Sequence, residues 1–278
     1  MRLSIVTINR NNAAGLEKTL QSVAFQTFKE FEYVVVDGAS TDSSVEVIKK
    51  YESRFVHLKW VSEPDSGIYN AMNKGIRMAS GDYIQILNSA DCLAAPDVTE
   101  RMIAALANSG NPSILYGNMI KCFPDGKTLV DKSFAGREIT MQGMYMGTLN
   151  HDPAYILRDL FEKYGYYDES LKIVSDWKWY LQAIVLGGEK PQYTDIDVTL
   201  FDMTGISESD GNKDKIRKER QMVLKDLIPS AYLHDYERYA DDICLMRRIH
   251  RHPWAYKLVW FMERCLFKLE KCSNKKSS

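Results

Sequence analysis

Short apolar runs alternate with helix-like segments over the first hundred residues, and this alternation limits the fold more than any other feature of the chain. Strands covered on both faces read as short runs rich in β-branched and aromatic residues. Between such runs, apolar residues recur at helical spacing, as at Leu16, Leu20 and Val23. The strand–helix repeat predicts an α/β fold with a parallel sheet and right-handed crossovers. Four runs are expected to form strands: residues 3–8, 33–36, 58–61 and 83–87.

The pattern becomes mixed after a fourth expected helix over residues 96–107. Residues 114–122 and 128–130 flank a Pro-Asp-Gly turn and predict a hairpin. A Met- and Gly-rich loop is expected over residues 141–149. The polar stretch after Gly205 predicts a boundary near residue 206. It divides a main domain from a helical extension, residues 1–206 and 207–278. A strand and two helices are expected before that boundary, over residues 154–157, 159–164 and 175–186.

Each of the four predicted strands ends in polar residues. The carboxyl ends of parallel strands meet at one edge of a sheet, where ligands bind in α/β proteins. Taken singly, Asp37 could instead open a turn and Asp91 could cap the next helix. Four such ends together favour a crevice that holds a nucleotide. The ends read Thr7-Ile8-Asn9-Arg10, Asp37-Gly38, Glu63-Pro64-Asp65 and Asn88-Ser89-Ala90-Asp91.

The loop after the first strand disfavours a dinucleotide oxidoreductase. A Rossmann site needs glycines there, because the pyrophosphate must approach the helix N-terminus. The loop reads NRNNAAG instead, and the chain has no P-loop motif. A divalent cation held by Asp91 is therefore the expected partner of any bound phosphates.

Composition and charge exclude several other classes of protein. The net charge of −1 disfavours a nucleic-acid-binding protein, although residues 246–278 alone carry nine Lys/Arg against two Glu. Five scattered cysteines without a C-x-x-C pair predict a reducing, cytoplasmic compartment and no zinc site. The first apolar run is too short for a signal peptide, and no run of 18 apolar residues follows. Neither export nor a membrane span is expected.

Five motifs, in this order and at this spacing, together resemble family 2 glycosyltransferases of the inverting, GT-A kind. The likeness is greatest to bacterial enzymes that build capsule, O-antigen and exopolysaccharide repeats, and it covers roughly residues 1–207. It implies a Rossmann-like GT-A domain with a mixed, mostly parallel sheet. The motifs are SIVTINRNN, VVVDGASTD, SEPDSGIYNAMNKGI, GDYIQILNSAD, and HDPAYILRDLFEKYGYYDES with KIVSDWKWYL.

The resemblance also implies roles for individual residues. Asp176 corresponds to the catalytic base, and Asp91 to the carboxylate that coordinates Mn²⁺ or Mg²⁺ at the donor's diphosphate. Asp37 corresponds to the residue that accepts a hydrogen bond from the nucleobase of the donor, typically uracil. His151 and Asp152 match the family's position beneath the acceptor pocket. Trp177 is a further candidate for acceptor binding because it stands next to Asp176. The other positions that match nucleotide-binding residues are Thr7, Asn9, Arg10, Asp65, Asn73, Asn88 and Ser89.

Structural interpretations stay open for three of these residues. Asp176 stands at a predicted helix start, where the helix dipole favours an acid. His151 could be an ordinary structural histidine. Trp177 could stack on an acceptor sugar or belong to the core.

The sequence departs from the family's pattern at two places. Arg10 stands where many relatives have Tyr, so a guanidinium plane or a phosphate contact replaces base stacking. The metal-binding turn carries Asn88 and Ala90, which leaves Asp91 as its one anionic ligand.

The leading hypothesis is transfer of a sugar from a nucleotide donor, expected to be a UDP-sugar, to a hydroxyl of a glycan or lipid-linked oligosaccharide in bacterial surface polysaccharide synthesis. Inversion requires a base that takes the proton from the attacking hydroxyl, and a group that stabilises the leaving diphosphate. The alternative is a non-catalytic nucleotide-sugar-binding scaffold. The loop over residues 201–207 is expected to close over the donor, with Gly205 as its hinge.

A basic amphipathic helix is predicted near the C-terminus. Trp254, Leu258, Phe261 or Met262, Cys265 and Leu269 form one apolar stripe. Such a helix can lie on an anionic membrane, here the inner face of the cell membrane. Packing on the main domain or on a second subunit of a homo-oligomer is the other interpretation.

Overall fold

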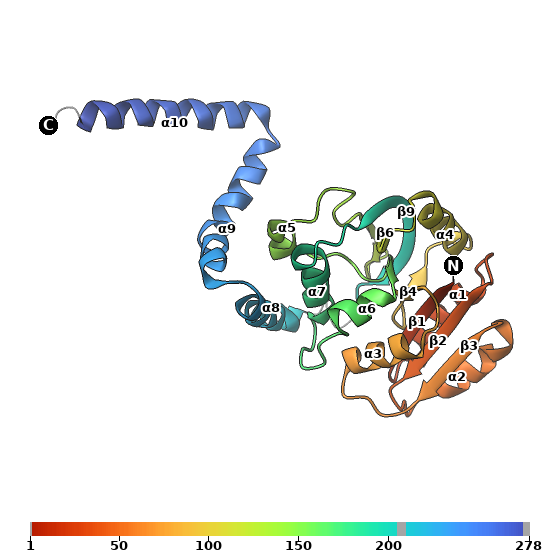
Figure 1. The fold of residues 1–278 in the computed structure, drawn as a ribbon. Coiled ribbons are helices and arrows are strands. Elements are labelled where there is room, and N and C mark those ends of the chain that lie inside the picture. Colours follow the sequence, from red (N-terminus) through yellow and green to blue (C-terminus); the bar gives the residue numbers. More distant parts are fainter. Residues whose placement is uncertain (1, 205–209, 275–278) are drawn as a thin grey trace. The chain divides into compact units, whose positions relative to one another are not determined.

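The four predicted strands form the parallel part of one sheet in a computed structural model that describes residues 2–204 and 210–274 (Figure 1). Their order is β3-β2-β1-β4, and every neighbouring pair among them is parallel. This order brings the ends of β1 and β2 side by side, with Asn9 opposite Asp37. The strands are β1 Leu3–Asn9, β2 Phe31–Asp37, β3 Leu58–Ser62 and β4 Tyr83–Ile86.

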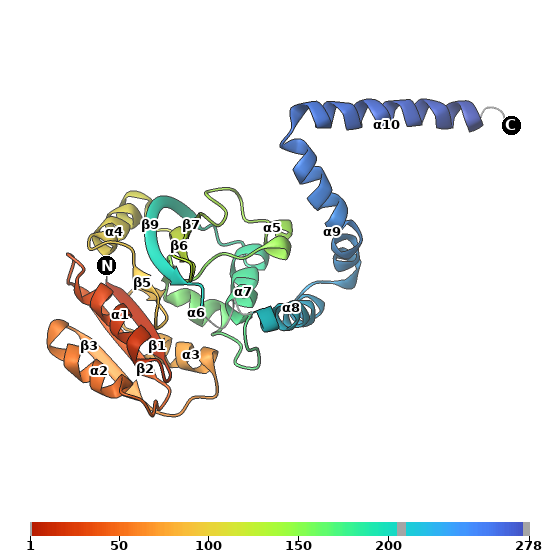
Figure 2. The same cartoon turned by 180° about the vertical axis from the view of Figure 1, so that it is seen from behind.

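The four predicted helices cover both faces of this parallel part (Figures 1 and 2). Side chains of α1, α2 and α4 form one buried cluster with Ile5 and Tyr33. Helix α3 packs on the opposite face, where a Cβ at Gly75 would lie 2.3 Å from Val6 Cγ1. Only glycine allows this close approach of helix and strand. The helices are α1 Ala13–Ala24, α2 Ser44–Tyr51 with a 3-10 turn at Glu52–Arg54, α3 Ile68–Met78 and α4 Val98–Asn108.

The sheet continues beyond β4 with mixed pairing, in the order β4-β8-β6-β9-β5. The predicted hairpin is confirmed as β6 and β7, while β9 was not predicted. Strand β9 contains Asp195 and Asp197, a residue type depleted in strands, and both accept hydrogen bonds from Asn118 of the adjacent β6. The strands are β5 Cys92–Leu93, β6 Ile114–Cys122, β7 Thr128–Asp131, β8 Ala154–Leu157 and β9 Gln192–Asp202.

Three short helices lie between these strands. The expected loop over residues 141–149 contains α5, which Thr140 caps by accepting a hydrogen bond from the Gly143 N–H. The helix expected over residues 175–186 forms, but its second half is a π-helix. The elements are α5 Met141–Met146, α6 Asp159–Tyr164, α7 Ser175–Tyr180 and the π-helix Leu181–Leu186.

The C-terminal part is helical, as predicted, and the chain divides into compact units of residues 1–223 and 224–278. The first unit thus includes much of α8. The boundary predicted near residue 206 lies outside the described residues and stays a prediction. The closure expected of residues 201–207 also stays a prediction: residues 205–207, with the expected hinge Gly205, lie outside the described residues, whereas Phe201 and Asp202 belong to β9. Among the described residues, no helix combines the length and apolarity needed to span a membrane. The elements are the 3-10 turn Asp210–Asn212, α8 Lys213–Leu227, α9 Ser230–His250 and α10 Pro253–Asn274.

Candidate active site

The turn Asn88–Asp91 follows β4 and is fixed to α1. Ala90 has a φ of 86°, in the left-handed region that costs an L-residue about 1 kcal/mol. The Thr19 hydroxyl of α1 accepts a hydrogen bond from the Ala90 N–H at 3.0 Å and donates one to the Asp91 carbonyl at 2.7 Å. These two bonds hold the turn, and with it the Asp91 side chain.

Asp91 and Asp152 form a buried carboxyl pair, which the sequence did not predict. Asp91 is 4% exposed, and its Oδ1 accepts a hydrogen bond from the Asp202 N–H at 2.9 Å. Asp152 is 2% exposed, and its Oδ1 accepts no hydrogen bond from the described residues. Burial and the charge of Asp152 raise the pKa of Asp91 well above its usual value. The pair therefore favours either a shared proton or a bound cation.

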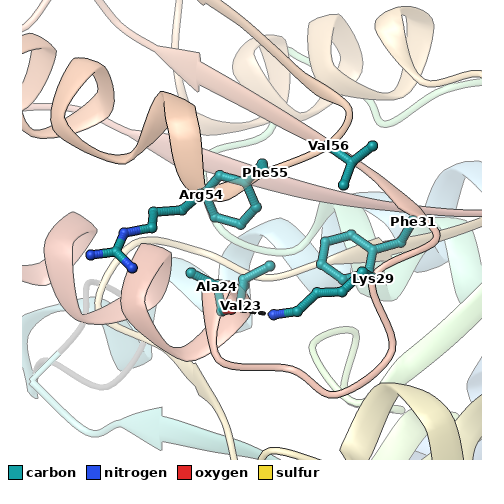
Figure 3. A pocket seen from close by; sticks show the side chains of 7 residues that line it. All are labelled: Val23, Ala24, Lys29, Phe31, Arg54, Phe55 and Val56. Carbon is teal, nitrogen blue, oxygen red and sulfur yellow. Dashed lines mark hydrogen bonds between the residues drawn. The ribbon is translucent and has the colours of Figure 1, made fainter.

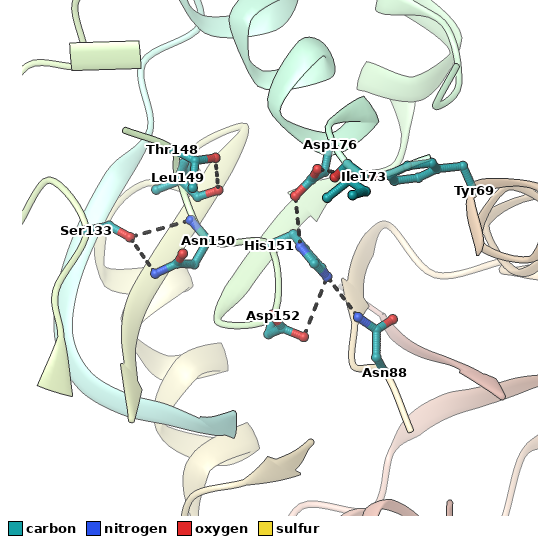
Figure 4. Close-up of polar contacts among 10 residues, drawn as sticks. All are labelled: Tyr69, Asn88, Ser133, Thr148, Leu149, Asn150, His151, Asp152, Ile173 and Asp176. Atoms are coloured by element: carbon teal, nitrogen blue, oxygen red, sulfur yellow. Dashed lines mark hydrogen bonds and ion pairs between the residues drawn. The ribbon is translucent and has the colours of Figure 1, made fainter. Parts of the chain in front are cut away.

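His151 links this pair to Asp176 (Figure 4). Its Nδ1 lies 3.2 Å from Asp176 Oδ2, and its Nε2 lies 3.6 Å from Asp152 Oδ1. Burial lowers the pKa of His151, but the charge of Asp152 and the hydrogen bond with Asp176 outweigh it and raise the pKa to about 9. The imidazole is thus a cation at neutral pH, between carboxylates on both sides.

Asn88 completes the contacts of this imidazole. Its Nδ2 lies 3.2 Å from His151 Nε2, while its Oδ1 is buried without a hydrogen-bond partner among the described residues. Both ring nitrogens of a protonated histidine are donors. Rotating the Asn88 amide by half a turn would place its oxygen against the protonated Nε2, so the charged imidazole favours that orientation.

Asp176 lies in the first turn of α7 and is 17% exposed at its side chain. Its Oδ1 is 3.0 Å from the hydroxyl of Tyr69 in α3. Burial raises the pKa of Asp176, but the hydrogen bonds and charge of His151 and the Tyr69 hydroxyl more than offset it, so the pKa lies below its usual value. Asp176 is therefore an ionised carboxylate that keeps some access to solvent, as a base requires.

The ends of β1 and β2 meet at the carboxylate of Asp37, whose hydrogen-bonding positions are all occupied. Asp37 is buried and accepts hydrogen bonds from Asn9 Nδ2 at 2.9 Å, from the Ser40 N–H and hydroxyl, and from the Ser62 hydroxyl at 2.7 Å. Burial raises the pKa of Asp37, yet these bonds outweigh it and lower the pKa. The nucleobase of a donor could bind Asp37 only if a serine hydroxyl turned away. The predicted contact between Asp37 and the nucleobase therefore stays a prediction.

Arg10 and Asp65 lie above Asp37 at the same rim. Arg10 Nη1 lies 3.6 Å from Asp65 Oδ1, and the Arg10 side chain is 62% exposed. A Cβ at position 38 would lie 2.1 Å from Asp65 Oδ2, so Gly38 is needed for this approach. Arg10 is the exposed cation of the rim, which suits a contact with phosphate or a base plane.

Three predicted ligands are enclosed by the chain instead. The Thr7 hydroxyl lies 2.9 Å from that of Tyr33 in the core. Asn73 is 1% exposed and binds both the N–H and the carbonyl of Tyr167. Trp177 is 2% exposed and donates to the Met144 carbonyl. The stacking role predicted for Trp177 is therefore not what the structure shows: the ring belongs to the core.

Ser89 is partly exposed at the rim, where its N–H donates to the Ile8 carbonyl at 3.1 Å. The structure thus brings the metal-binding turn, Arg10, Asp65 and Asp176 to neighbouring strand and helix ends. The pairing of His151 with both acids is the feature that sequence reasoning missed.

Helix α8 supports the segment before Asp176, and the sequence did not indicate this. Glu219 Oε1 accepts the Lys172 N–H at 2.9 Å, and Oε2 accepts those of Ile173 at 2.9 Å and Val174 at 3.3 Å. Next to it, the Arg220 guanidinium lies 4.7 Å from the centre of the Trp177 ring. No local signal could have revealed contacts across more than 40 residues of chain.

A small pocket lies far from this site, at the start of β2 (Figure 3). There the Lys29 ammonium donates to the Ala24 carbonyl at the end of α1. The pocket opens at the amino end of the strand, whereas the candidate site lies at the carboxyl ends. Its lining residues are Val23, Ala24, Lys29, Phe31, Arg54, Phe55 and Val56.

The residues around Asp91 fit a hard divalent cation. Among the described residues, no group of three or more His, Cys, Asp or Glu side chains is arranged to hold a metal by itself. Asp91, the unbonded Oδ1 of Asp152 and the side-chain oxygen of Asn88 are oxygen donors on one turn and the adjoining strand end. The Asn88 oxygen has two lone pairs, so one remains when the other accepts from His151. Mg²⁺ and similar ions are commonly held by one or two carboxylates together with substrate phosphates.

Comparisons with known proteins give a consistent result. The family model described as Glycosyl transferase family 2 matches residues 4–167. An uncharacterized glycosyltransferase of Mycobacterium tuberculosis is 32% identical over 207 residues, which cover 73% of this chain and 76% of the relative. A PGL/p-HBAD biosynthesis glycosyltransferase of Mycobacterium bovis is 24% identical over 221 residues, covering 77% and 82%.

Solved structures share the fold. S. aureus TarS 1-349 in complex with UDP-GlcNAc superimposes with a TM-score of 0.61 at 22% identity, covering 73% of this chain and 58% of that TarS chain. A mannosyltransferase from Pyrobaculum calidifontis, in complex with GDP-Man and Mn²⁺, gives 0.56 at 19% identity, covering 72% and 56%. The chain therefore spans less than two thirds of the length of these structural neighbours.

Proposed function

The chain belongs to glycosyl transferase family 2 and has the GT-A fold, and from this premise we propose that it is an inverting, metal-dependent enzyme. It transfers a sugar from a nucleotide donor to a hydroxyl of a glycan or lipid-linked oligosaccharide. The observation that carries the proposal is Asp176, an ionised carboxylate held between His151 and Tyr69 with part of its surface open.

Asp176 is the proposed general base. An acceptor hydroxyl that approaches it loses its proton to the carboxylate as the oxygen attacks the anomeric carbon. His151 fixes the orientation of the carboxylate through Oδ2, which leaves Oδ1, near the Tyr69 hydroxyl, to receive the proton. The low pKa of Asp176 keeps it ionised, so the fixed geometry must compensate for its modest basicity.

Asp91 is the proposed metal ligand, with Asp152 and Asn88 as further oxygen donors. A bound divalent cation would neutralise the diphosphate as the leaving group departs. Binding of that cation would also remove the need for a proton between Asp91 and Asp152. Arg10, exposed at the same rim, is the proposed protein contact to the nucleotide.

The donor is proposed to be a UDP-sugar. TarS in its complex holds UDP-GlcNAc and the archaeal relative holds GDP-Man, so the fold accommodates both nucleotides. Asn9 and Asp37, which pair at the ends of β1 and β2, are the proposed recognition groups for uracil. This requires Ser40 or Ser62 to release Asp37 when the donor binds.

The acceptor is proposed to be a glycan or glycolipid used in bacterial surface polysaccharide synthesis. The Mycobacterium bovis relative is named for PGL/p-HBAD biosynthesis, so one bacterial relative acts in a biosynthetic pathway of this general kind. A reducing, cytoplasmic site of action is part of the proposal. It is supported by the free thiols of Cys92, Cys122 and Cys265.

Asp176→Asn tests the proposed base. The variant should lose transfer by a factor of at least about 10³, because the amide cannot accept the proton, while its affinity for UDP with Mn²⁺ changes little. Release of UDP from a panel of UDP-sugars with acceptor measures turnover, and calorimetry measures binding. Asp125→Asn, at an exposed position in the turn between β6 and β7, is the matched control.

The same experiment separates the alternative of a non-catalytic scaffold. A scaffold would bind the nucleotide sugar in the wild-type form without Mn²⁺-dependent turnover of any donor. Full transfer activity in Asp176→Asn would refute the assignment of the base.

A further inference from the structure

Helix α10 exposes an unusual amount of apolar surface. It is one continuous helix, Pro253–Asn274 (Figure 2). Its large apolar side chains are exposed from its first turn onward. Trp254 is 70% exposed and Leu269 is 66% exposed. Proteins rarely leave so much contiguous apolar surface uncovered unless it binds something. The other exposed apolar residues of the helix are Tyr256, Leu258, Val259, Trp260, Phe261, Met262, Leu266 and Phe267.

The cations of α10 lie on one side of it. Lys257, Arg264 and Lys268 are spaced by seven and four residues, close to whole turns of a helix. Successive residues are turned by about 100° around the helix axis. The side away from this row is formed by Leu258, Met262, Leu266 and Leu269, which their spacing places about 100° to 180° around the axis from Lys257. Glu263 stands four residues after Val259 and three before Leu266, so an acid lies at one edge of this apolar side.

Aromatic residues occupy the borders between these two sides. Trp260 and Phe261 each lie within about 60° of the cationic row on either flank, by their spacing from Arg264 and Lys257. Arg264 also packs its guanidinium 4.0 Å from the centre of the Trp260 ring. Tryptophan at the boundary between a charged and an apolar side is typical of helices that lie in a membrane interface.

We propose that α10 docks in the plane of an anionic phospholipid surface, with Met262 and Leu266 toward the acyl chains and the row Lys257, Arg264 and Lys268 toward the headgroups. The surrounding charge supports this choice of occupant. Residues 246–278 carry nine Lys/Arg and two Glu, a net charge of +7 in a chain whose total is −1. Basic clusters beside an apolar helix face attract anionic lipid.

A second copy of the chain is a weaker candidate for the occupant. Two copies of α10 would bring together two segments of the same net charge, because residues 246–278 carry nine Lys/Arg against two Glu. The membrane surface requires no such approach of like charges. The inference does not depend on the proposed catalytic roles, because its test needs no turnover.

Sedimentation of the full chain with lipid vesicles tests the proposal. Binding is expected to vesicles of equal parts phosphatidylglycerol and phosphatidylcholine, and to be at least about tenfold weaker to pure phosphatidylcholine. The charge reversal Lys257→Glu/Arg264→Glu/Lys268→Glu should weaken the binding to anionic vesicles at least about tenfold. Met262→Ser/Leu266→Ser should weaken it as well, by removing the side that enters the acyl chains.

The matched control is Lys49→Glu/Arg101→Glu/Lys127→Glu, which makes the same charge change at exposed positions of residues 1–223. It should bind like the wild type. Quenching of Trp254 and Trp260 by brominated lipid gives an independent readout, which Trp254→Phe/Trp260→Phe should abolish. Absence of binding by the wild type would overturn the proposal. An equal loss of vesicle binding in the control variant would also overturn it. A third contrary result would be that the wild type forms concentration-dependent dimers, which the α10 variants disrupt, and does not bind vesicles.

Discussion

Asp176 and His151 form an ion pair that shapes the properties of the candidate base. An isolated buried carboxylate would be protonated, because burial disfavours the charged form. The imidazolium reverses this, at the cost of making the carboxylate a weaker base. Asp152, on the far side of the ring, keeps the imidazole protonated. One histidine thus connects the proposed proton acceptor to the proposed metal-binding pair.

Asp91→Asn is expected to weaken the binding of Mn²⁺ in the presence of UDP at least about tenfold, because an amide oxygen carries no charge. Calorimetric titration of Mn²⁺ into the protein with saturating UDP measures this. Asp97→Asn, at an exposed acid six residues further along the chain, provides the control and should bind Mn²⁺ like the wild type. Unchanged Mn²⁺ affinity in Asp91→Asn would remove Asp91 from the metal site.

Glu32 should make stability depend on pH in the acid range. Burial raises the pKa of Glu32, but hydrogen bonds from Lys59, Ser4 and Ser80 outweigh it and lower the pKa to about 2. The folded-state pKa lies below the unfolded value, so the stabilisation is present above about pH 4.5 and is lost as the pH falls toward 2.

Glu32→Gln is therefore expected to lower the free energy of unfolding by roughly 1–2 kcal/mol at pH 7, less than the full linkage value because Lys59 is half exposed. Urea unfolding from pH 7 to pH 3 should show the difference from the wild type shrinking as the pH falls. Glu30→Gln, at an exposed neighbouring position, should show no such trend. A difference that stays constant with pH would contradict this account.

At the scale of elements, the site depends on contacts between segments that are distant in the chain. Helix α1 fixes the turn after β4 through Thr19, and α3 reaches Asp176 through Tyr69. Helix α8 binds the backbone before α7 through Glu219. Three separate helices thereby set the positions of the Asn88–Asp91 turn and of Asp176.

Glu219→Gln is expected to reduce kcat about tenfold and to change KM little. One carboxylate oxygen becomes an NH₂ group that faces backbone N–H groups, at a cost of about 1–3 kcal/mol, and Asp176 loses its fixed position. Steady-state kinetics with a thermal-unfolding measurement test this, and Lys218→Gln on the exposed side of α8 is the control. A variant that loses stability but keeps wild-type kcat would show that Glu219 is structural only.

For the whole molecule, the compact units of residues 1–223 and 224–278 predict that the two parts of the chain can be separated by function. Deleting residues 253–278 removes α10. The shortened chain should keep the main thermal unfolding transition within about 2 °C and keep transfer to a water-soluble acceptor, because the site lies within residues 1–223. Loss of transfer to a soluble acceptor would show that α10 also serves the catalytic unit.

The periodicity of the sequence determined the parallel part of the sheet, its four helices and the hairpin. Each of these elements is specified by neighbouring residues, because a strand or a helix shows its buried face as a local pattern. The resemblance identified the residues at the strand ends because they belong to short motifs, which are also local in the sequence. Strand β9 was not predicted, because Asp195 and Asp197 are unusual in strands and are stabilised here by Asn118 of a strand distant in the sequence.

Only the tertiary structure decided what the site residues contact. It placed Asp152 beside Asp91 and joined both to Asp176 through His151, and it enclosed Trp177 in the core. The sequence alone suggested that the metal-binding turn had one carboxylate; the fold brings a second from another segment. Pairing and burial depend on which distant segments pack together, and that information is absent from the spacing of residues along the chain.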